Sequence, residues 1–330
     1  MHGLSLKFRY SYLYLWVLSL FSIPLVGQSY PVGDHFAEIG EVKLHFSVRG
    51  AGPYLVVGHP NSGKIGYQLS LQPLEAVFTV VYYDPRGTGQ SSAPAALNGY
   101  HQAELVDEIE ALRKELKAEQ FWLFGHSDQS AVALEYALRY PTSTAGLLLT
   151  GTSLIGDQSA SILRRKQTEQ QRAAESPWFA QILADWDYMD KHQTRFDATG
   201  RDISTAPLKW WCYDEASFQK VWPIAQAIAQ AGRRKPIGEA YYSESDVQRA
   251  RYLDYQAKID QLQLPVLLLN GRYDTNNPPQ AVEALARKIP HAFLVIVEQA
   301  GHFPWVEQPV IAFEAILRWC SKQGLSSKNR

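Results

Sequence analysis

Short, largely apolar runs alternate with longer amphipathic segments along most of the chain. Such runs occupy residues 54–57, 121–124 and 264–269. Runs of this length and composition are typical of strands that are buried on both faces of a sheet. Segment 99–118 instead spaces its apolar residues as one face of a helix does. Strands that alternate with helices predict a parallel sheet covered by helices on both faces, with functional sites at the carboxyl ends of the strands.

The same patterns predict the remaining elements. The alternation of apolar residues between 36 and 49 predicts a strand with one exposed face, paired with the strand before it. Taken together, the strands are expected to form a doubly wound, mostly parallel sheet of eight strands. The other expected elements are strands at 78–83, 145–150 and 293–297, and helices at 279–288 and 306–322.

The alternation is interrupted between residues 153 and 261. This stretch is polar, helical in pattern, and holds five of the nine tryptophans, Trp178, Trp186, Trp210, Trp211 and Trp222. A long insertion between sheet strands is typical of a helical lid over the catalytic edge. We therefore predict a core formed by 28–152 and 262–330, with a lid at 153–261. The lid tryptophans are expected mainly in the lid's own core.

The N-terminus resembles a secretory signal peptide. Lys7 and Arg9 precede an apolar run from 10 to 26, and small and polar residues follow it. The alternative is an uncleaved membrane anchor, which needs about 20 apolar residues. We favour cleavage after Gly27, because the run ends there. The predictions are a signal peptide at 1–27, a secreted or periplasmic location, and no stable membrane association after cleavage.

Composition limits the class of ligand. The chain has 330 residues, of which 46% are hydrophobic and 20% charged, as in globular proteins. Because 32 basic side chains balance 33 acidic ones, no nucleic-acid partner is implied and a small, nearly neutral substrate is expected. Cys212 and Cys320 form no metal-ligand pattern with the histidines, so we expect free thiols and neither metal nor cofactor. No particular oligomeric state is predicted.

A glycine and a serine mark the end of the run 121–124. Gly125, one intervening residue and Ser127 lead into an alanine-rich amphipathic segment. This pattern predicts a nucleophile elbow, in which a sharp strand-to-helix turn exposes the serine hydroxyl. Gln129 stands where such turns usually have a second glycine. The sequence does not predict where its long side chain points.

Two later loops complete a pattern. Asp274 follows the strand 264–269 in Gly-Arg-Tyr-Asp, and His302 follows the strand 293–297 in Gly-His-Phe-Pro. Together with the elbow and the Asp-Pro-Arg-Gly-Thr-Gly loop at 84–89, these motifs resemble those of α/β-hydrolases. The 84–89 loop and the residues after the elbow are most similar to proline iminopeptidases. That family's His-Gly-Gly-Pro-Gly motif is replaced by His-Pro-Asn-Ser-Gly at 59–63.

The resemblance implies roles for individual residues. Ser127 would be the nucleophile, His302 its general base, and Asp274 the group that orients the imidazole. The backbone N–H groups of Asp128 and Asn61 would form the oxyanion hole. His59 and His126, which lie close to these motifs, are interpreted as structural. An Asp128 nucleophile, as in a dehalogenase or epoxide hydrolase scheme, is rejected because Ser127 occupies the apex.

The resemblance also implies an activity. We expect a proline iminopeptidase-like aminopeptidase that acts on a small molecule or short peptide. The lid residues Glu239, Glu244 and Asp246 could bind a free α-amino group or could simply be solvated. A carboxylesterase or lactonase for small esters is an alternative, since an aromatic lid also suits such substrates. A catalytically slow ligand-binding protein is a third, and Gln129 is the feature that hints at it.

Overall fold

The computed structural model describes residues 30–95, 97–152, 158–232 and 257–326. The predicted signal peptide at 1–27 lies outside these residues, as do Glu239, Glu244 and Asp246. Within the described ranges, none of the helices has the length and apolar character needed to span a membrane.

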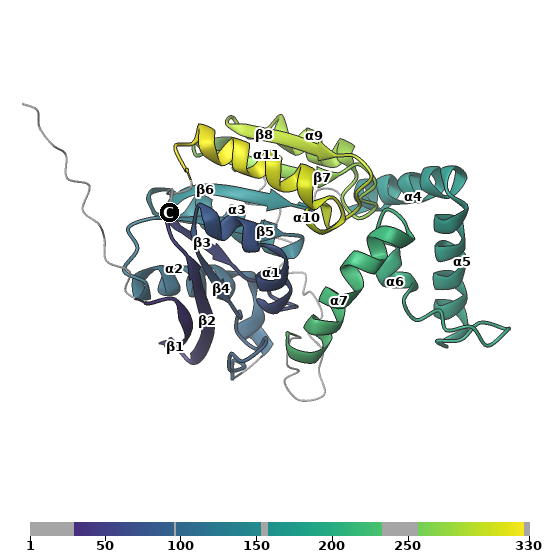
Figure 1. Ribbon diagram of the computed structural model, residues 1–330, viewed down its shortest axis with the longest axis horizontal. Coiled ribbons are helices and arrows are strands. Elements are labelled where there is room, and N and C mark those ends of the chain that lie inside the picture. Colours follow the sequence, from purple (N-terminus) through teal and green to yellow (C-terminus); the bar gives the residue numbers. More distant parts are fainter. Residues whose placement is uncertain (1–29, 96, 153–157, 233–256, 327–330) are drawn as a thin grey trace, which may run out of the picture.

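One eight-stranded sheet forms the centre of the molecule, as the sequence predicts (Figure 1). Its strand order is β1-β2-β4-β3-β5-β6-β7-β8. Strand β2 is antiparallel to β1 and β4, and all other pairs are parallel. The strands are β1 (Gly33–Ile39), β2 (Val42–Gly50), β3 (Tyr54–Val57), β4 (Thr79–Tyr83), β5 (Phe121–His126), β6 (Thr144–Thr150), β7 (Val266–Gly271) and β8 (Ala292–Val297).

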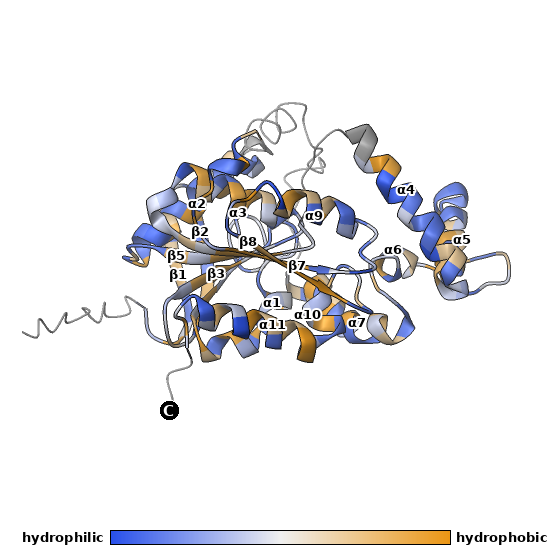
Figure 2. Ribbon diagram, turned by 90° about the horizontal axis from the view of Figure 1, so that it is seen from above, coloured by the Kyte–Doolittle hydropathy of each residue, from blue (hydrophilic) through white to orange (hydrophobic). Residues whose placement is uncertain are grey.

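Helices cover both faces of the sheet (Figure 2). An apolar core lies on each face, which explains why the central strands are apolar throughout. Ile109 and Leu134 belong to one core, whereas Leu74 and Ile316 belong to the other. One face is covered by α2 (Gln102–Glu115), α3 (Asp128–Arg139) and α9 (Pro279–Ala286), and the other by α1 (Ile65–Ser70), α10 (Pro304–Glu307) and α11 (Pro309–Lys322).

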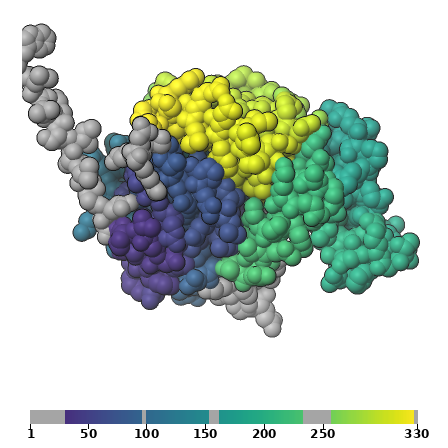
Figure 3. Space-filling view, viewed as in Figure 1, coloured from purple at the N-terminus to yellow at the C-terminus, as the bar shows by residue number. Residues whose placement is uncertain are grey.

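The described part of the predicted lid is helical. Its helices form a lobe beside the core, at the carboxyl ends of the parallel strands (Figures 1 and 3). Ser176 and Asp214 cap two of them, because their side chains accept hydrogen bonds from N–H groups in the first turn. The four are α4 (Gln158–Glu175), α5 (Pro177–His192), α6 (Ala206–Lys209) and α7 (Glu215–Ala231).

Arg172 of α4 fastens the lid to the core. Its guanidinium is buried and donates to the Thr275 hydroxyl at 2.7 Å and to the Cys212 carbonyl at 2.8 Å. It also stacks over the Phe179 ring, 3.7 Å from the ring centre. Burial lowers the pKa of Arg172 to about 10, so the group stays charged at neutral pH. The lid therefore has a fixed attachment beside the loop that follows β7.

Two local expectations are wrong. Strand β2 has no fully exposed face, because His45 and Ser47 are buried. The His45 ring is covered by the loop after β4, where its Nδ1 lies 2.9 Å from Asp84 Oδ2. The single helix expected at 306–322 is divided into α10 and α11 at Gln308, because Pro309 has no N–H to continue the first helix.

Candidate active site

Ser127 occupies the tight turn between β5 and α3, at the centre of the sheet. Its φ of 52° lies in the left-handed region, which is strained for a residue with a side chain. The Ser127 N–H donates to the Thr150 carbonyl at 3.1 Å. A Cβ at Gly125 would lie 2.8 Å from the Ser130 Cα, so this turn requires glycine there. The structure thus has the sharp turn predicted for a nucleophile elbow.

Gln129 is accommodated inside the protein. Its side chain is buried and its carboxamide lies near the Tyr83 hydroxyl at the end of β4. Neither Gln129 Oε1 nor the Tyr83 hydroxyl has a hydrogen-bond partner among the described residues. Helix α3 nevertheless begins directly after the elbow, at Asp128. The long side chain therefore leaves buried polar groups without hydrogen bonds, but it does not disturb the geometry of the turn.

His302 and Asp274 form a buried pair. Their side chains are 2% and 0% exposed, and His302 Nδ1 lies 2.9 Å from Asp274 Oδ2. The other carboxylate oxygen of Asp274 accepts the N–H groups of Asn276 and Asn277, each at 2.9 Å. Both carboxylate oxygens are therefore held by hydrogen bonds. Because a carboxylate only accepts, His302 Nδ1 carries the proton of the bond between them. His302 Nε2 is left as the atom able to accept a proton.

The pair sets the charge state of the imidazole. Burial alone would lower the pKa of His302, but the charge and hydrogen bond of Asp274 outweigh it and the net pKa is raised. Only the neutral ring can accept a proton, so we expect kcat/KM to fall on the acid side with a midpoint above the ordinary histidine value of about 6.5. A pH profile of kcat/KM measures this. A midpoint at or below that value contradicts the assignment of His302 as the base.

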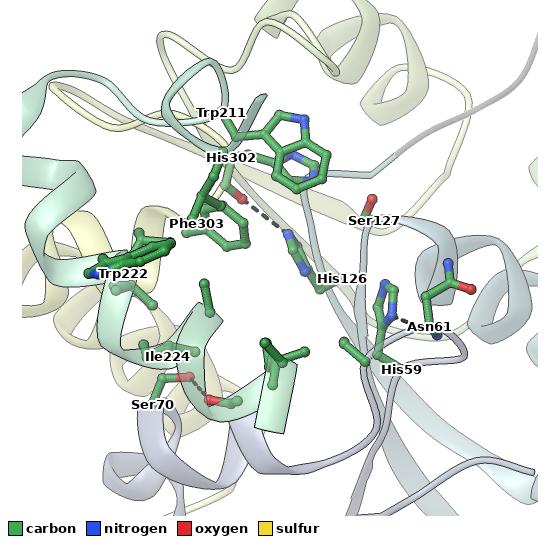
Figure 4. Close-up of a pocket in the computed structure, with 18 of the residues that line it drawn as sticks. His59, Asn61, Ser70, His126, Ser127, Trp211, Trp222, Ile224, His302 and Phe303 are labelled. Atoms are coloured by element: carbon green, nitrogen blue, oxygen red, sulfur yellow. Dashed lines mark hydrogen bonds between the residues drawn. The ribbon is translucent and has the colours of Figure 1, made fainter. Parts of the chain in front are cut away.

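His126, the last residue of β5, packs against His302 in the loop after β8. The ring centres are 4.6 Å apart, and His126 Nε2 lies 3.2 Å from the His302 carbonyl oxygen (Figure 4). The Tyr67 hydroxyl meets His126 Nδ1 at 2.9 Å. Burial and the charge of His302 hold the pKa of His126 well below its ordinary value, so the ring stays neutral. These contacts support the structural role expected for His126.

The two residues predicted for the oxyanion hole lie together beside Ser127. Asn61 Nδ2 donates to Asp128 Oδ2 at 2.8 Å. The Asn61 N–H, however, donates to His59 Nδ1 at 3.1 Å (Figure 4). In this conformation that donor is engaged, and it would have to leave His59 to meet an oxyanion. The oxyanion role of Asn61 and Asp128 stays a prediction.

A cavity of about 680 Å³ opens at Ser127 and His302. Its walls come mainly from apolar side chains of α6, α7 and α10 and of residues that flank α6 and α10. Lid tryptophans Trp211 and Trp222 line it, whereas Trp178, Trp186 and Trp210 pack in the lid's own clusters. The α7 wall of the cavity was not predicted from the sequence. The spacing of apolar residues on one face of α7 is the signal that could have predicted this wall. The α7 residues that line the cavity include Val221, Ile224, Ala225 and Ile228.

Glu307 holds the His302 loop in place. Its buried carboxylate accepts the N–H groups of Gly301 at 2.9 Å and Phe303 at 3.0 Å, on both sides of His302. The same carboxylate accepts the N–H of Tyr213 in the lid at 2.9 Å. Burial raises the pKa of Glu307, although the three N–H donors act against that rise. One side chain therefore joins the loop that carries His302 to the lid.

Replacing Glu307 with alanine should destabilise the protein. Three buried N–H groups would lose their acceptor, and we expect the free energy of unfolding to fall by about 3 kcal/mol or more. Glu307→Gln keeps one acceptor oxygen and should lose less. Urea denaturation measures both variants, with Glu314→Gln on the exposed side of α11 as the control. A free energy of unfolding of Glu307→Ala within about 0.5 kcal/mol of wild type contradicts a stabilising role for the Glu307 carboxylate.

The two cysteines are buried thiols. Cys212 and Cys320 are buried and free, as expected. Burial raises the pKa of both thiols, that of Cys320 to about 12. No group of three or more His, Cys, Asp or Glu side chains suited to a metal ion occurs in the ranges that the structure describes.

Comparisons with known proteins agree with this architecture. A proline iminopeptidase of Chitinophaga pinensis is 24% identical over 255 residues, covering 75% of this chain and 82% of the relative. Among solved structures, a thermophilic esterase from Thermogutta terrifontis is similar at 25% identity and a TM-score of 0.61, over 88% of this chain and 99% of that one. A proline iminopeptidase of Mycobacterium smegmatis gives 18% identity and a TM-score of 0.64, over 89% and 99%. The family model for the alpha/beta hydrolase fold matches residues 54–309. Because the match spans most of the length of this chain, the chain belongs to the α/β-hydrolase fold family.

Proposed function

We propose that this protein is a serine hydrolase that uses Ser127, His302 and Asp274 as its catalytic triad. The observation that carries the proposal is that the strained Ser127 and His302, which is hydrogen-bonded to the buried Asp274, line the same cavity. A strained serine, a neutral imidazole nitrogen and a fixed carboxylate at one site suit acyl transfer.

The proposed reaction has two acyl-transfer steps. The Ser127 oxygen attacks the acyl carbon while His302 Nε2 accepts the hydroxyl proton, and the carbonyl electrons move onto the oxygen. When the tetrahedral species collapses, the bond to the leaving group breaks and His302 donates its proton to that group. Water then attacks the acyl-enzyme by the same route and restores Ser127. Backbone N–H groups of Asp128 and Asn61 would stabilise each oxyanion, the latter after it leaves His59.

The first substrate class that we propose is the N-terminal residue of a short peptide. The relatives named proline iminopeptidase support it, and the cavity of about 680 Å³ is ample for one small apolar residue. The protein would then be a proline iminopeptidase-like aminopeptidase.

A carboxylesterase or lactonase is the second candidate. The predominantly apolar walls, including Trp211, Trp222 and Ile224, suit the acyl chain of a small neutral ester (Figure 4). The likeness to the Thermogutta esterase adds support.

A substrate panel separates the candidates. Purified protein is offered prolyl and alanyl arylamides beside short-chain aryl esters, with a fluorophosphonate to label Ser127. Turnover of the arylamides supports the aminopeptidase, and turnover of esters alone supports the esterase. Absence of both turnover and Ser127 labelling contradicts the serine hydrolase and favours a slow ligand-binding protein.

We also propose that the protein is exported after removal of residues 1–27. The basic residues followed by an apolar run carry this proposal. N-terminal sequencing of exported protein should begin within about two residues of Gln28. Retention of the first 27 residues in exported material contradicts it.

A further inference from the structure

Asp128 places a formal negative charge at the cavity. Among the described residues that line the cavity, it is the sole one with an Asp, Glu, Lys or Arg side chain. It directly follows Ser127 and is exposed to the cavity. Its Oδ1 accepts no hydrogen bond from another described residue, whereas its Oδ2 accepts Asn61 Nδ2 at 2.8 Å. One carboxylate oxygen is therefore available to a ligand.

The carboxylate is held in position from the opposite loop. The Asn61 N–H donates to His59 (Figure 4). The Asn61 side chain donates to Asp128 Oδ2. A side chain held before a ligand arrives loses less conformational freedom on binding. The cavity thus presents a preoriented anionic group beside the serine.

A lone carboxylate at this place is unfavourable for neutral substrates. The oxyanion would develop near the Asp128 N–H, and two like charges at that short separation repel each other. The charge of Asp128 also acts on His302. Burial lowers the pKa of His302, whereas Asp274 and, to a smaller extent, Asp128 raise it. A cation on the substrate would remove the repulsion, and an anionic acyl group would increase it.

We propose that the Asp128 carboxylate receives the free α-ammonium group of the substrate and thereby selects substrates with a cation next to the scissile carbonyl. The α-carbon is bonded to the carbonyl carbon that Ser127 attacks, so an ammonium on it lies close to the following residue. This inference rests on the proposed serine hydrolase and names its substrate class. Asn61 is the positioning residue for the carboxylate.

The test compares two boronic acids of nearly the same shape. 1-Aminoethylboronic acid carries an α-ammonium, and isopropylboronic acid carries a methyl group in its place. In both, the Ser127 oxygen forms a bond to boron, and the proton passes to His302. The readout is the concentration that half-protects Ser127 from fluorophosphonate labelling, which needs no turnover. We expect the wild type to prefer the amino compound by about 10- to 100-fold, the usual size of a charge-assisted contact.

The Asp128→Asn variant removes the charge but keeps the backbone N–H and an oxygen for Asn61. We expect the amino compound to weaken until the two inhibitors differ by less than about threefold, while isopropylboronic acid binds as well as before or better. Asp107→Asn, at an exposed carboxylate of α2 outside the cavity, should keep the wild-type preference. A Tm within a few degrees of wild type shows that the variant is folded.

The outcomes separate the two proposals. Equal protection by both boronic acids in the wild type overturns the role of Asp128, and this arm requires no variant. A preference that persists in Asp128→Asn also overturns it and places the ammonium on another group. Failure of the fluorophosphonate to label wild-type Ser127 overturns the proposed function itself and this inference with it.

Discussion

Ser127→Ala should lower kcat/KM by at least about 10⁴-fold for any substrate that the wild type hydrolyses. The substitution removes the oxygen that forms the acyl-enzyme and leaves the cavity and the backbone donors in place. Alanine has the same Cβ as serine, so the strain of the turn at φ 52° is retained. We therefore expect the variant to fold with a Tm within a few degrees of wild type.

Ser130→Ala is the matched control for this loss. Ser130 lies on the same turn and is buried, but it does not line the cavity. Its hydroxyl is 3.5 Å from the Thr150 carbonyl, a weak contact whose removal should change kcat/KM by less than about fivefold. Residual activity of Ser127→Ala within a hundredfold of wild type, measured by active-site titration to exclude contamination, contradicts its role as nucleophile.

The parts of the site that the sequence predicts follow directly from local patterns. An apolar strand, a glycine and the next serine specify the elbow around Ser127. Asp274 and His302 each come just after a strand of the parallel sheet, and the carboxyl ends of such strands meet at one edge. Their contact could therefore be expected before any distance was known.

The parts that the sequence does not predict depend on contacts between distant segments. Glu307 accepts N–H groups from the His302 loop and from Tyr213, which lies 94 positions earlier. Arg172 reaches a hydroxyl 103 positions away. Neither residue carries a local pattern that distinguishes it from a solvated charge. The pairing of the Asn61 N–H with His59 was also unpredictable, since it depends on a side-chain orientation within one loop.

Gln129 shows how a motif can tolerate a misfit. Nucleophile elbows usually have a small residue at this position. The longer Gln129 occupies it here, and α3 still begins directly after Ser127. The side chain fits because it enters the protein near Tyr83 instead of lying across the turn. A motif specifies the backbone that chemistry needs, whereas the space around it is decided by the rest of the fold. The departure from glycine is therefore no argument against a functional elbow.

Asp274→Asn should lower kcat by about 10⁴-fold while leaving the fold intact. An asparagine has the shape of aspartate, and its Oδ1 can still accept the N–H groups of Asn276 and Asn277. Its amide nitrogen, however, would face His302 Nδ1 as a donor. The imidazole would then carry its proton on Nε2, the atom that must accept the Ser127 proton, so the base would be blocked.

The double variant Asp274→Asn with His302→Ala distinguishes this mechanism from general damage to the site. If Asp274 acts through the imidazole, the second substitution should cost little beyond the effect of His302→Ala alone, because the residues work as one unit. Independent contributions would instead multiply. Fold-losses that multiply in the double variant, or a kcat of Asp274→Asn within tenfold of wild type, would remove Asp274 from the triad and leave a Ser127–His302 dyad as the catalytic group.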